Sequence, residues 1–442
     1  MASNKKIANW GNYPSVEAHL DEFENPKQAF EKLDAAGSII ARGTGLSYGD
    51  ASLASSILST LRYNRILSFD EANGVLEVEA GITIDEVLKV IVPKGWFVPV
   101  TPGTKFVTIG GAVAGDVHGK NHHRESSFCH YVTRMEVMLA DGTILQCSPE
   151  QNAELFRNLC GGLGLGGIVL KVQFSLKRIQ TAYIRQQNKM VKNLDEMIDG
   201  LQQFGSTTYS VSWIDCIAKG KSMGRGVLML GEHATPDQVK TEDKFKVHSN
   251  PKLSVPFFFP PGILNSFSIG IFNTMVYNKY KIGAKDSIVH YDTFFYPLDF
   301  VRNWNRAYSK RGFLQYQFVI PYETAREGLR EILKAISGSG RAAFLAVLKE
   351  MGPGENVISF PLPGFTLALD FPVAPGIFPF LEELDKRIVD FGGRIYLVKD
   401  ARMTAETYWK GYPNAAVFKE QVNRLDPDHK FSSTLSKRLQ MK

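Results

Sequence analysis

The spacing of apolar and polar residues predicts short strands and helices in alternation over the first 175 or so residues. Two hairpins stand out, each formed by two strand-like runs that flank an Asn-Gly or Asp-Gly turn. One joins Arg65–Phe69 to Val75–Glu79, and the other joins Met135–Leu139 to Thr143–Cys147. A further apolar run, Ile168–Phe174, is typical of a strand that closes this region.

Helix starts in the same region are marked by capping residues. Thr83-Ile84-Asp85-Glu86 has the spacing of a capping box and predicts a helix to about Val92. Ser148-Pro149-Glu150-Gln151 predicts the start of another helix, which continues to about Leu159.

After residue 180 the apolar runs become longer and helices with one apolar face separate them. The predicted helices are Thr324–Ile336 and Phe378–Phe391, and Lys219–Lys285 is expected to form long loops. The predicted strands are Tyr209–Ile214, Gly226–Leu230, Ser287–Tyr296, Leu314–Pro321, Ala342–Leu348 and Gly364–Phe371. This order favours an antiparallel sheet covered by helices on one face, and therefore an α+β fold.

A chain of 442 residues is long for one core, so two domains are expected. We place the first domain at residues 1–178 and the second at 179–393. Residues 394–442, with a helix at Ala405–Trp409, are expected to return to the first domain.

Composition excludes several classes of protein. With 44% apolar and 22% charged residues the chain is typical of a globular protein, and its net charge of +6 is dispersed, which disfavours nucleic-acid binding. The four cysteines, Cys129, Cys147, Cys160 and Cys216, lack the pairing of a disulfide framework or a zinc site. No metal site is expected, because carboxylates at ligand spacing are lacking near the histidines.

The segment Leu253–Asn278 contains no charged residue. Its prolines and polar residues disfavour a membrane-spanning helix, so it is expected either to meet a lipid tail or bilayer face, or to be a buried loop. The N-terminus lacks the apolar core of a signal peptide. A cytoplasmic protein is therefore expected, with contact at the inner face of the plasma membrane as an option.

Two glycine-rich runs carry the candidate chemistry. Residues 101–124 hold five glycines, a helix-capping Thr108 and three histidines, and residues 42–49 hold three more glycines. Such runs let backbone N–H groups approach a phosphate, although they also serve tight turns.

A third run, Gly162–Gly167, matches the GxGxxG pattern of dinucleotide-binding Rossmann folds. That fold needs a strand before the glycines and a helix after them. Here the predicted helix comes first and the strand Ile168–Phe174 follows, and no acidic residue lies about 20 positions further on. We therefore interpret the match as a false positive.

Together these runs resemble the flavin domain of vanillyl-alcohol-oxidase (PCMH-type) FAD proteins, and specifically the decaprenylphosphoryl-β-D-ribose 2-oxidase family. The more specific motifs are His-Gly-Lys-Asn-His-His at 118–123 and Tyr-Leu-Val-Lys-Asp at 396–400. The resemblance spans nearly the whole chain and implies a two-domain FAD-binding fold.

The resemblance implies that FAD lies between the glycine runs. The residues implied to contact it are Arg42, Gly43, Thr44, Gly45, Leu46, Ser47, Tyr48, Gly49, Gly103, Thr108, Ile109, Gly110, Gly111, Gly115, Asp116, Val117, His118, Ile168 and Tyr396. In many relatives a histidine of the first glycine loop is bonded covalently to the flavin. Leu46 occupies that place here and cannot form the bond, so non-covalent FAD is expected.

Lys399 and His118 are the candidate catalytic residues, because the resemblance places both beside the flavin and the sugar. A buried lysine can lose its proton and act as a base, or stay charged and hold an anion. The implied substrate-binding residues are Tyr48, Lys120, Trp213, Gln315, Gln317, Lys349 and Lys399. Gln315 and Gln317 alternate on one predicted strand, so they share a face. There their side-chain amides either bind sugar hydroxyls or form hydrogen bonds to a neighbouring strand.

The implied reaction is oxidation of the 2-hydroxyl of a polyprenylphosphoryl-β-D-ribose to the 2-keto sugar. An NAD(P)H-dependent reductase partner would then complete an epimerisation to arabinose. Two alternatives stay open: a soluble aldonolactone or alditol oxidase, and a non-catalytic lipid-binding flavoprotein subunit. Some members of the family carry a cysteine on the strand beside the sugar, where Ala368 stands here.

Overall fold

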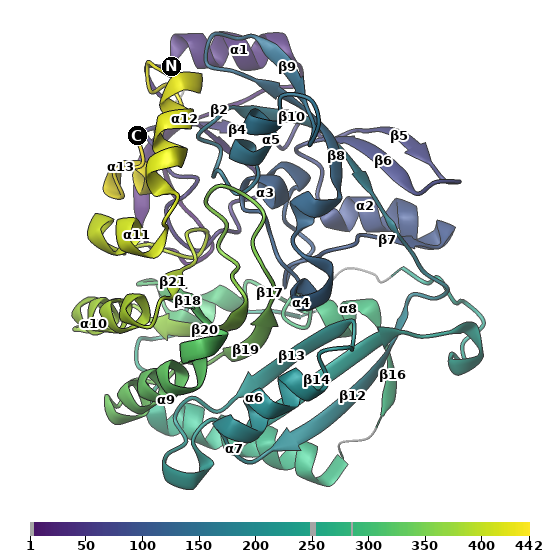
Figure 1. The fold of residues 1–442 in the computed structure, drawn as a ribbon, viewed down its shortest axis with the longest axis vertical. Coiled ribbons are helices and arrows are strands. Elements are labelled where there is room, and N and C mark those ends of the chain that lie inside the picture. Colours follow the sequence, from purple (N-terminus) through teal and green to yellow (C-terminus); the bar gives the residue numbers. More distant parts are fainter. Residues whose placement is uncertain (1–3, 248–252, 284–285) are drawn as a thin grey trace.

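The computed structural model describes residues 4–247, 253–283 and 286–442. The upper half of the molecule in Figure 1 contains a four-stranded sheet of order β1-β2-β4-β3 and a five-stranded antiparallel sheet of order β5-β6-β10-β8-β9. The first comprises β1 Lys5–Ala8, β2 Ser15–Glu22, β3 Ile40–Arg42 and β4 Ser56–Ser59. The second comprises β5 Ile66–Asp70, β6 Val75–Glu79, β8 Val132–Met138, β9 Ile144–Cys147 and β10 Ile168–Ser175. Both predicted hairpins are thus confirmed.

Within residues 4–178, five α-helices belong to this half. They are α1 Pro26–Ala35, α2 Ile84–Ile91, α3 Ile109–Ala114, α4 His122–Glu125 and α5 Ala153–Leu159. The capping box at Thr83 is confirmed, with both of its reciprocal hydrogen bonds formed at the start of α2. The prediction for Ser148 was wrong in detail: its hydroxyl accepts from the N–H groups of Glu150 and Gln151 in a turn, and α5 begins after Asn152.

The Gly162–Gly167 run joins α5 to β10, so a helix precedes the glycines and a strand follows them. This order confirms that the GxGxxG match is not a Rossmann fingerprint.

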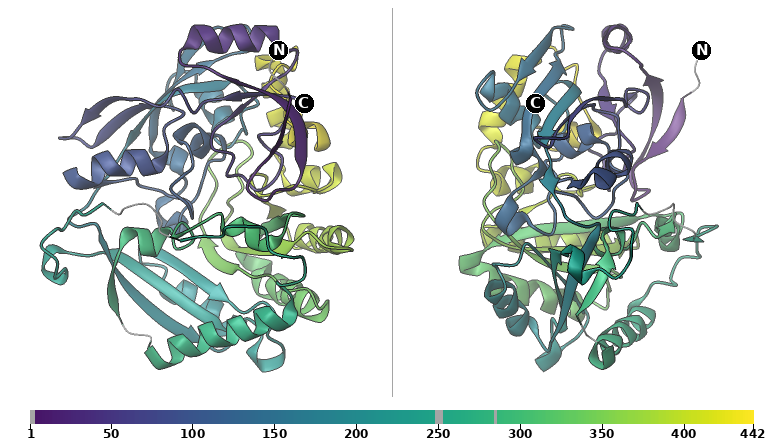
Figure 2. Two further views of the ribbon diagram at one scale, coloured as in Figure 1. Left: turned by 180° about the vertical axis from the view of Figure 1, so that it is seen from behind. Right: turned by 90° about the vertical axis from the view of Figure 1, so that its right-hand side faces the viewer.

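The lower half is built on an eight-stranded antiparallel sheet of order β16-β12-β14-β13-β19-β20-β18-β21. Its strands are β12 Tyr183–Val191, β13 Tyr209–Ile214, β14 Gly226–His233, β16 Ser287–His290, β18 Phe313–Pro321, β19 Ala346–Met351, β20 Gly364–Pro372 and β21 Arg394–Ile395. The helices α6 Leu194–Gln203, α9 Tyr322–Gly338 and α10 Ile377–Asp390 pack on one face, as predicted. Figure 1 looks onto this face, and the left panel of Figure 2 shows the other face from behind.

Successive side chains of β18 and β20 point to opposite faces of the sheet, so apolar side chains lie on one face and polar side chains on the other. The helix-covered face carries Tyr316, Phe318, Ile320, Leu367 and Leu369, all buried in the largest core cluster. The polar face carries Gln315, Gln317, Thr366 and Asp370, together with Lys349 of β19, whose register partner is Thr366. This polar face is turned toward the glycine-rich loops of the upper half.

Three predictions for the second half were wrong. Lys219–Lys285 is not all loop, because α7 (Ser266–Gly283) follows the proline-rich turn once the Asn265 side chain accepts from the N–H groups of Phe267 and Ser268. Ser287–Tyr296 is not one strand: β16 ends at His290, whose ring caps the short helix α8 (Tyr291–Phe295). The strand expected at Ala342–Leu348 lies at Ala346–Met351, because apolar composition alone did not fix its start.

The C-terminal residues lie against the upper half. After β21 pairs with β18, the helices α11 Ala405–Gly411, α12 Ala415–Leu425 and α13 Thr434–Arg438 run beside the N-terminal strands (Figure 1). A bridge joins Ile39 to Phe431, and Arg438 forms ion pairs with Asp50 and Asp400. Through Arg438, Asp400, the neighbour of Lys399, is therefore linked to the C-terminal helix α13 and to Asp50 of the N-terminal region.

Candidate active site

The loop after β3 presents a row of backbone donors. Among the described residues, the N–H groups of Gly43 to Ser47 have no hydrogen-bond partner. The loop is held by its neighbours instead, since the Thr44 hydroxyl donates to the carbonyl of Phe106 at 2.9 Å. Consecutive free N–H groups of this kind form a concave site for an anion.

Glycine brings this loop against the second glycine run. A Cβ on Gly43 would lie 2.2 Å from Oγ1 of Thr108, so no side chain fits there. At its other end, a Cβ on Gly49 would lie 1.6 Å from the carbonyl oxygen of Asp400. The loop is therefore wedged between the start of α3 and the residue that follows Lys399.

The backbone N–H groups at the start of α3 have hydrogen-bond partners, unlike those of the first loop, although both segments are rich in glycine. The amides of Ile109 and Gly110 donate to the carbonyls of Ile82 and Ala80, each at 2.8 Å, and that of Gly111 donates to Oγ1 of Thr108. These donors are already used. The α3 run can line a cofactor, whereas the loop of Gly43 to Ser47 can also bind its phosphates.

His118 lies at the centre of an aromatic and cationic cluster. Its Nε2 is 3.2 Å from the amide nitrogen of Gln317, and its Nδ1 is 3.1 Å from Nζ of Lys349. Tyr396 and Phe360 stack on each other with centroids 4.3 Å apart, and both rings contact the His118 ring. Burial lowers the pKa of His118 well below its usual value, and the charge of Lys349 adds to this shift, so the ring is neutral.

Lys399 lies in a second cluster on the same side. Its Nζ is 4.0 Å from the centroid of the Tyr48 ring. Burial lowers the pKa of Lys399 to about 7; the charge of Lys349 acts in the same direction and that of Asp370 opposes it. A lysine in this position is available as a free amine near neutral pH.

Asp370 is the acidic member of this cluster. Its Oδ1 accepts a hydrogen bond of 2.8 Å from Gln315, its register partner across the strands. Within the described part of the chain its buried Oδ2 and the buried Tyr308 hydroxyl make no hydrogen bond of standard geometry, yet Tyr308 is near enough to lower the pKa of Asp370. Burial raises the pKa of Asp370 to about 7. An unpartnered buried carboxylate oxygen can accept a hydrogen bond from a ligand.

Lys120 and Trp213 complete the lining. The Lys120 ammonium donates to the carbonyl of Phe294 and lies 4.4 Å from the centroid of that ring. Burial lowers the pKa of Lys120 to about 7, with a contribution from Lys349. Trp213 shares the polar face, because its register partner Val347 is opposite Ala368.

The side chains of some residues expected at the cofactor are occupied by other contacts. Ile109 and Ile168 have no exposed surface and belong to two core clusters, so their side chains do not reach open space. The guanidinium of Arg42 donates to Asn9 and to the carbonyl of Ala8, which holds the N-terminal strand against the loop.

Neighbouring polar residues of the hexapeptide region also have internal partners. The carboxylate of Asp116 accepts from the N–H of Cys129 and the amide of Asn356. His122 bonds to Ser127 and to the N–H of Gly352, and His123 to the carbonyl of Thr207.

Sequence reasoning missed three residues of the site. Asn9 donates to Ser47 Oγ and to the carbonyl of Gly49, and so braces the phosphate-binding loop. Asp370 could have been found from the sequence, because it is a carboxylate within a predicted apolar strand. That strand pairs with the one that carries Gln315 and Gln317. Phe360 carried none, since a loop residue has no periodicity.

The free N–H row, the two glycine approaches and the aromatic pair over His118 fit a phosphate-containing planar cofactor such as FAD. The site therefore defines a flavin-dependent oxidoreductase. Residues 29–148 match the family model described as an FAD binding domain.

Similarity to known proteins over the full length of the chain identifies the family within the flavin-dependent oxidoreductases. The chain is 36% identical to decaprenylphosphoryl-beta-D-ribose oxidase of Mycolicibacterium smegmatis, over 99% of this chain and 98% of that protein. It is 29% identical to an uncharacterized protein of Streptomyces coelicolor over 81% of this chain. Human delta(24)-sterol reductase is 33% identical over only 22% of this chain. The chain belongs to the decaprenylphosphoryl-beta-D-ribose oxidase family, uses FAD and is an enzyme of the oxidoreductase class.

Proposed function

We propose that this enzyme oxidises the 2-hydroxyl of a polyprenylphosphoryl-β-D-ribose to the 2-keto sugar. The observation that carries the proposal is that Lys399, His118, Lys349 and the two glutamines meet on the polar face opposite the phosphate-binding loop. The full-length relative, whose name states this substrate, supports the choice of sugar.

The FAD is proposed to be bound without a covalent bond. The loop of Gly43 to Ser47 would hold its pyrophosphate through backbone N–H groups, and Leu46 offers no nucleophile for attachment to the flavin. Acid or heat denaturation should release all the flavin into the supernatant. Yellow colour that stays with the precipitated polypeptide would contradict this part of the proposal.

Bound FAD supplies the two-electron acceptor for the hydride that leaves carbon 2. Lys399 then has the task of taking the hydroxyl proton, because its lowered pKa of about 7 leaves a free amine at neutral pH. His118 is less suited to this task, since burial and Lys349 both oppose its protonation. Its proposed role is to orient the sugar together with Gln317.

The remaining lysines are proposed to hold the phosphodiester. The charge of Lys349 lowers the pKa of Lys120, His118 and Lys399, so Lys349 lies close to all three. Gln315 and Gln317 are proposed to bind the ribose hydroxyls through amide groups that are held by Asp370 and Thr366.

A 2-keto sugar needs a later reduction to become arabinose, so we propose an NAD(P)H-dependent reductase as a partner. Because the substrate carries a polyprenyl tail, we also propose that the enzyme makes peripheral contact with a bilayer. Among the described residues, no helix combines the length and apolar content needed to cross one.

The soluble sugar-oxidase alternative has weaker support. A Neurospora crassa protein named "Putative D-arabinono-1,4-lactone oxidase" is 30% identical over 31% of this chain and 24% of its own length, which is a match far shorter than either protein. The non-catalytic alternative does not account for a lysine held near neutral pKa beside Tyr48.

The test of the reaction is the identity of the oxidised carbon. Turnover of a short-chain polyprenylphosphoryl ribose, followed by reduction with borodeuteride, should give ribose and arabinose that both carry deuterium at carbon 2. Deuterium at another carbon, or none, would overturn the assignment. The Lys399→Ala variant is the matched control for non-enzymatic oxidation.

A further inference from the structure

The exposed apolar side chains of this molecule are gathered in one region. Every described large apolar residue that is more than half exposed lies between residues 253 and 300. They are Leu253 (55%), Phe257 (63%), Phe267 (77%), Met275 (60%) and Phe300 (55%). A cluster of this kind on an otherwise ordinary surface marks an interaction site.

Helix α7 provides the helical part of this region. Phe267, Ile271 and Met275 are spaced by four residues and so form one stripe, which we call the α7 stripe. The opposite side of the helix is fixed to the protein, because Asn273 donates to Asp215 at 2.8 Å and Phe272 packs on Phe344. The helix therefore presents the α7 stripe outward on a firm support.

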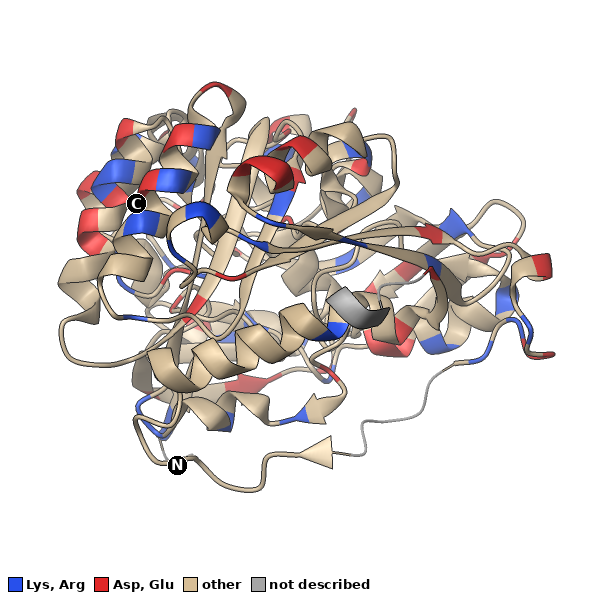
Figure 3. Ribbon diagram, turned by 90° about the horizontal axis from the view of Figure 1, so that it is seen from below, with Lys and Arg blue, Asp and Glu red and all other residues tan. Residues whose placement is uncertain are grey.

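The sequence that leads into and through α7 is rich in lysine. Residues 244–285 contain six lysines and no aspartate or glutamate, although Asp243 and Asp286 flank this range. Figure 3 shows α7 and the loop that carries β15 (Leu253–Ser254) crossing this face with almost no charged residues, apart from lysine at the C-terminal end of the helix. Apolar side chains bordered by lysines are the pattern of helices that lie in a bilayer interface.

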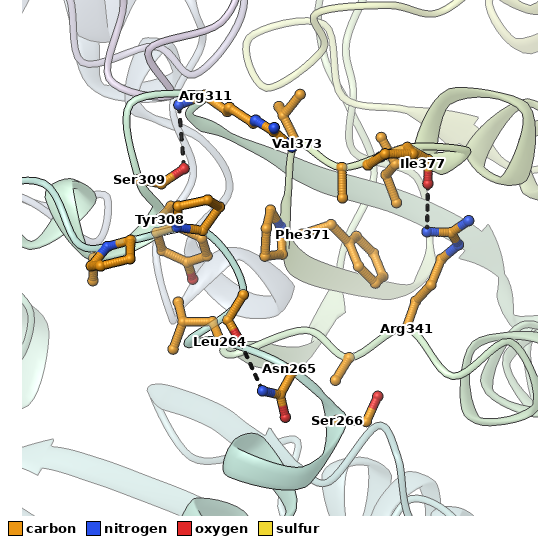
Figure 4. Close-up of a pocket in the computed structure, with 18 of the residues that line it drawn as sticks. Leu264, Asn265, Ser266, Tyr308, Ser309, Arg311, Arg341, Phe371, Val373 and Ile377 are labelled. Carbon is orange, nitrogen blue, oxygen red and sulfur yellow. Dashed lines mark hydrogen bonds between the residues drawn. The ribbon is translucent and has the colours of Figure 1, made fainter.

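A cavity of about 440 Å³ opens directly beside the N-terminal end of α7. Leu264 lines one side of it, and Phe371, Val373 and Ile377 line the other, with Arg311 and Arg341 at the ends (Figure 4). Tyr308 also lines the cavity and stacks on Phe313, which in turn contacts Tyr48 of the active site. An apolar cavity next to the α7 stripe can accept a hydrocarbon chain from a membrane.

We propose that the α7 stripe and the loop around Phe257 insert into the interface of an anionic lipid bilayer. This inference rests on the peripheral bilayer contact proposed above and names the surface that makes it, a surface that binds lipid whether or not substrate is turned over. The lysine content without acidic residues selects an anionic bilayer over a second copy of this chain, whose own matching surface would bring like charges together.

The test is flotation of the FAD-loaded protein with vesicles of phosphatidylcholine containing phosphatidylglycerol, in the absence of substrate. Wild type should float, and Phe267→Ser/Ile271→Ser/Met275→Ser should lose about 100-fold in vesicle affinity. A matched control, Leu67→Ser/Ile144→Ser/Val417→Ser, removes three exposed apolar side chains from other surfaces and should float as wild type does. Pure phosphatidylcholine vesicles should bind at least about ten-fold more weakly.

Flotation of the stripe variant at wild-type affinity, or failure of the wild type to float, would overturn the proposal. So would a wild-type dimer that the stripe variant dissociates while neither binds vesicles, because the occupant would then be a second copy. As a second measurement, Phe267→Trp should show fluorescence that bromine-labelled lipid chains quench; absence of quenching would place residue 267 outside the bilayer. Flavin absorbance and the unfolding temperature of each variant confirm that it is folded.

Loss of vesicle binding and failure of the proposed reaction are distinguishable. The stripe variant should still oxidise a short-chain, water-soluble substrate at the wild-type rate, because the α7 stripe lies outside the cluster of Lys399 and His118. A fall in that rate equal to the fall in vesicle affinity would contradict a purely membrane-binding role.

Discussion

The two faces of the eight-stranded sheet are built from alternate residues of the same strands, yet they serve different ends. On β18, Tyr316 and Phe318 face the covering helices, whereas Gln315 and Gln317 face the flavin loops. The helix-covered face gains stability by excluding water. The polar face leaves a buried carboxylate oxygen and lysines with lowered pKa values, which are arrangements that cost stability and provide chemistry.

The register of β18 and β20 determines which side chains line the active site. Because the side-chain period of a strand is two, a shift of one residue would exchange Gln317 for Phe318 beside His118. The pairing of Phe318 with Leu367 on the helix-covered face opposes this shift, since it would expose both apolar side chains. Core packing on one face therefore positions the chemistry on the other.

The largest effect is expected from Lys399→Ala. Removing the proposed base should slow flavin reduction by about 1,000-fold while FAD stays bound. Stopped-flow reduction under anaerobic conditions measures the rate, and flavin absorbance measures occupancy. Lys410→Ala, an exposed lysine of α11, serves as control. A rate within three-fold of wild type would remove Lys399 from the mechanism.

On the opposite face, Phe318→Ala should act on stability. This side chain is fully buried among the helices, so its loss should lower the free energy of unfolding by about 3–5 kcal/mol. Gln317→Ala, its sequence neighbour, should instead affect turnover more than stability. Denaturant unfolding and steady-state rates separate the two. Equal losses of stability in both variants would mean that the faces are not distinct.

The phosphate-binding loop offers the next test. Gly43→Ala places a Cβ 2.2 Å from Oγ1 of Thr108 and should force the loop away, which lowers FAD affinity at least about ten-fold. Gly37→Ala, where no atom lies within 4 Å of the added carbon, should bind FAD as wild type does. Fluorescence titration of the apoprotein with FAD gives both values. Unchanged affinity for Gly43→Ala would place the pyrophosphate elsewhere.

The pH profile tests the link between Asp370 and Lys399. Activity should rise with pH through about 7 as the Lys399 amine loses its proton. The negative charge of Asp370 raises the pKa of Lys399. The Asp370→Asn variant should therefore show the same rise in activity at lower pH. Rates of flavin reduction between pH 5.5 and 9 are the measurement. A limb that moves to higher pH would contradict the assigned charges.

The smallest effect is expected from Ala368→Cys. Ala368 lies on the polar face opposite Gln317 and is not required by the proposed mechanism. Turnover should stay within about two-fold of wild type, and the variant should gain a thiol that labelling reagents reach only when substrate is absent. Labelling that substrate does not slow would place residue 368 away from the sugar.

Much of this arrangement could be predicted because local sequence patterns determine it. The hairpins, the capping box at Thr83 and the strands of Gln315 and Gln317 follow from periodicity and turn residues. Helix α7 was missed because prolines precede it, and its own polar residues obscure the stripe of Phe267, Ile271 and Met275.

The residues of the active site could be predicted only in part from the sequence. Sequence similarity indicated Lys399 and His118. The lowered pKa of His118 comes first from its burial and then from the charge of Lys349, which is 231 residues away in the chain. Likewise, the difference between free amides at Gly43 to Ser47 and used amides at Gly110 depends on which carbonyls lie opposite. Such contacts arise from tertiary structure, and no local pattern contains them.

The most direct test of the account is anaerobic bleaching of the visible flavin band of the purified protein. A short-chain polyprenylphosphoryl ribose should bleach it rapidly, while free aldonolactones and alditols should not. Bleaching by the free sugars alone would contradict the account and indicate a soluble sugar oxidase. A yellow protein that no sugar bleaches would remove the proposed reaction and leave only the flavin-binding fold.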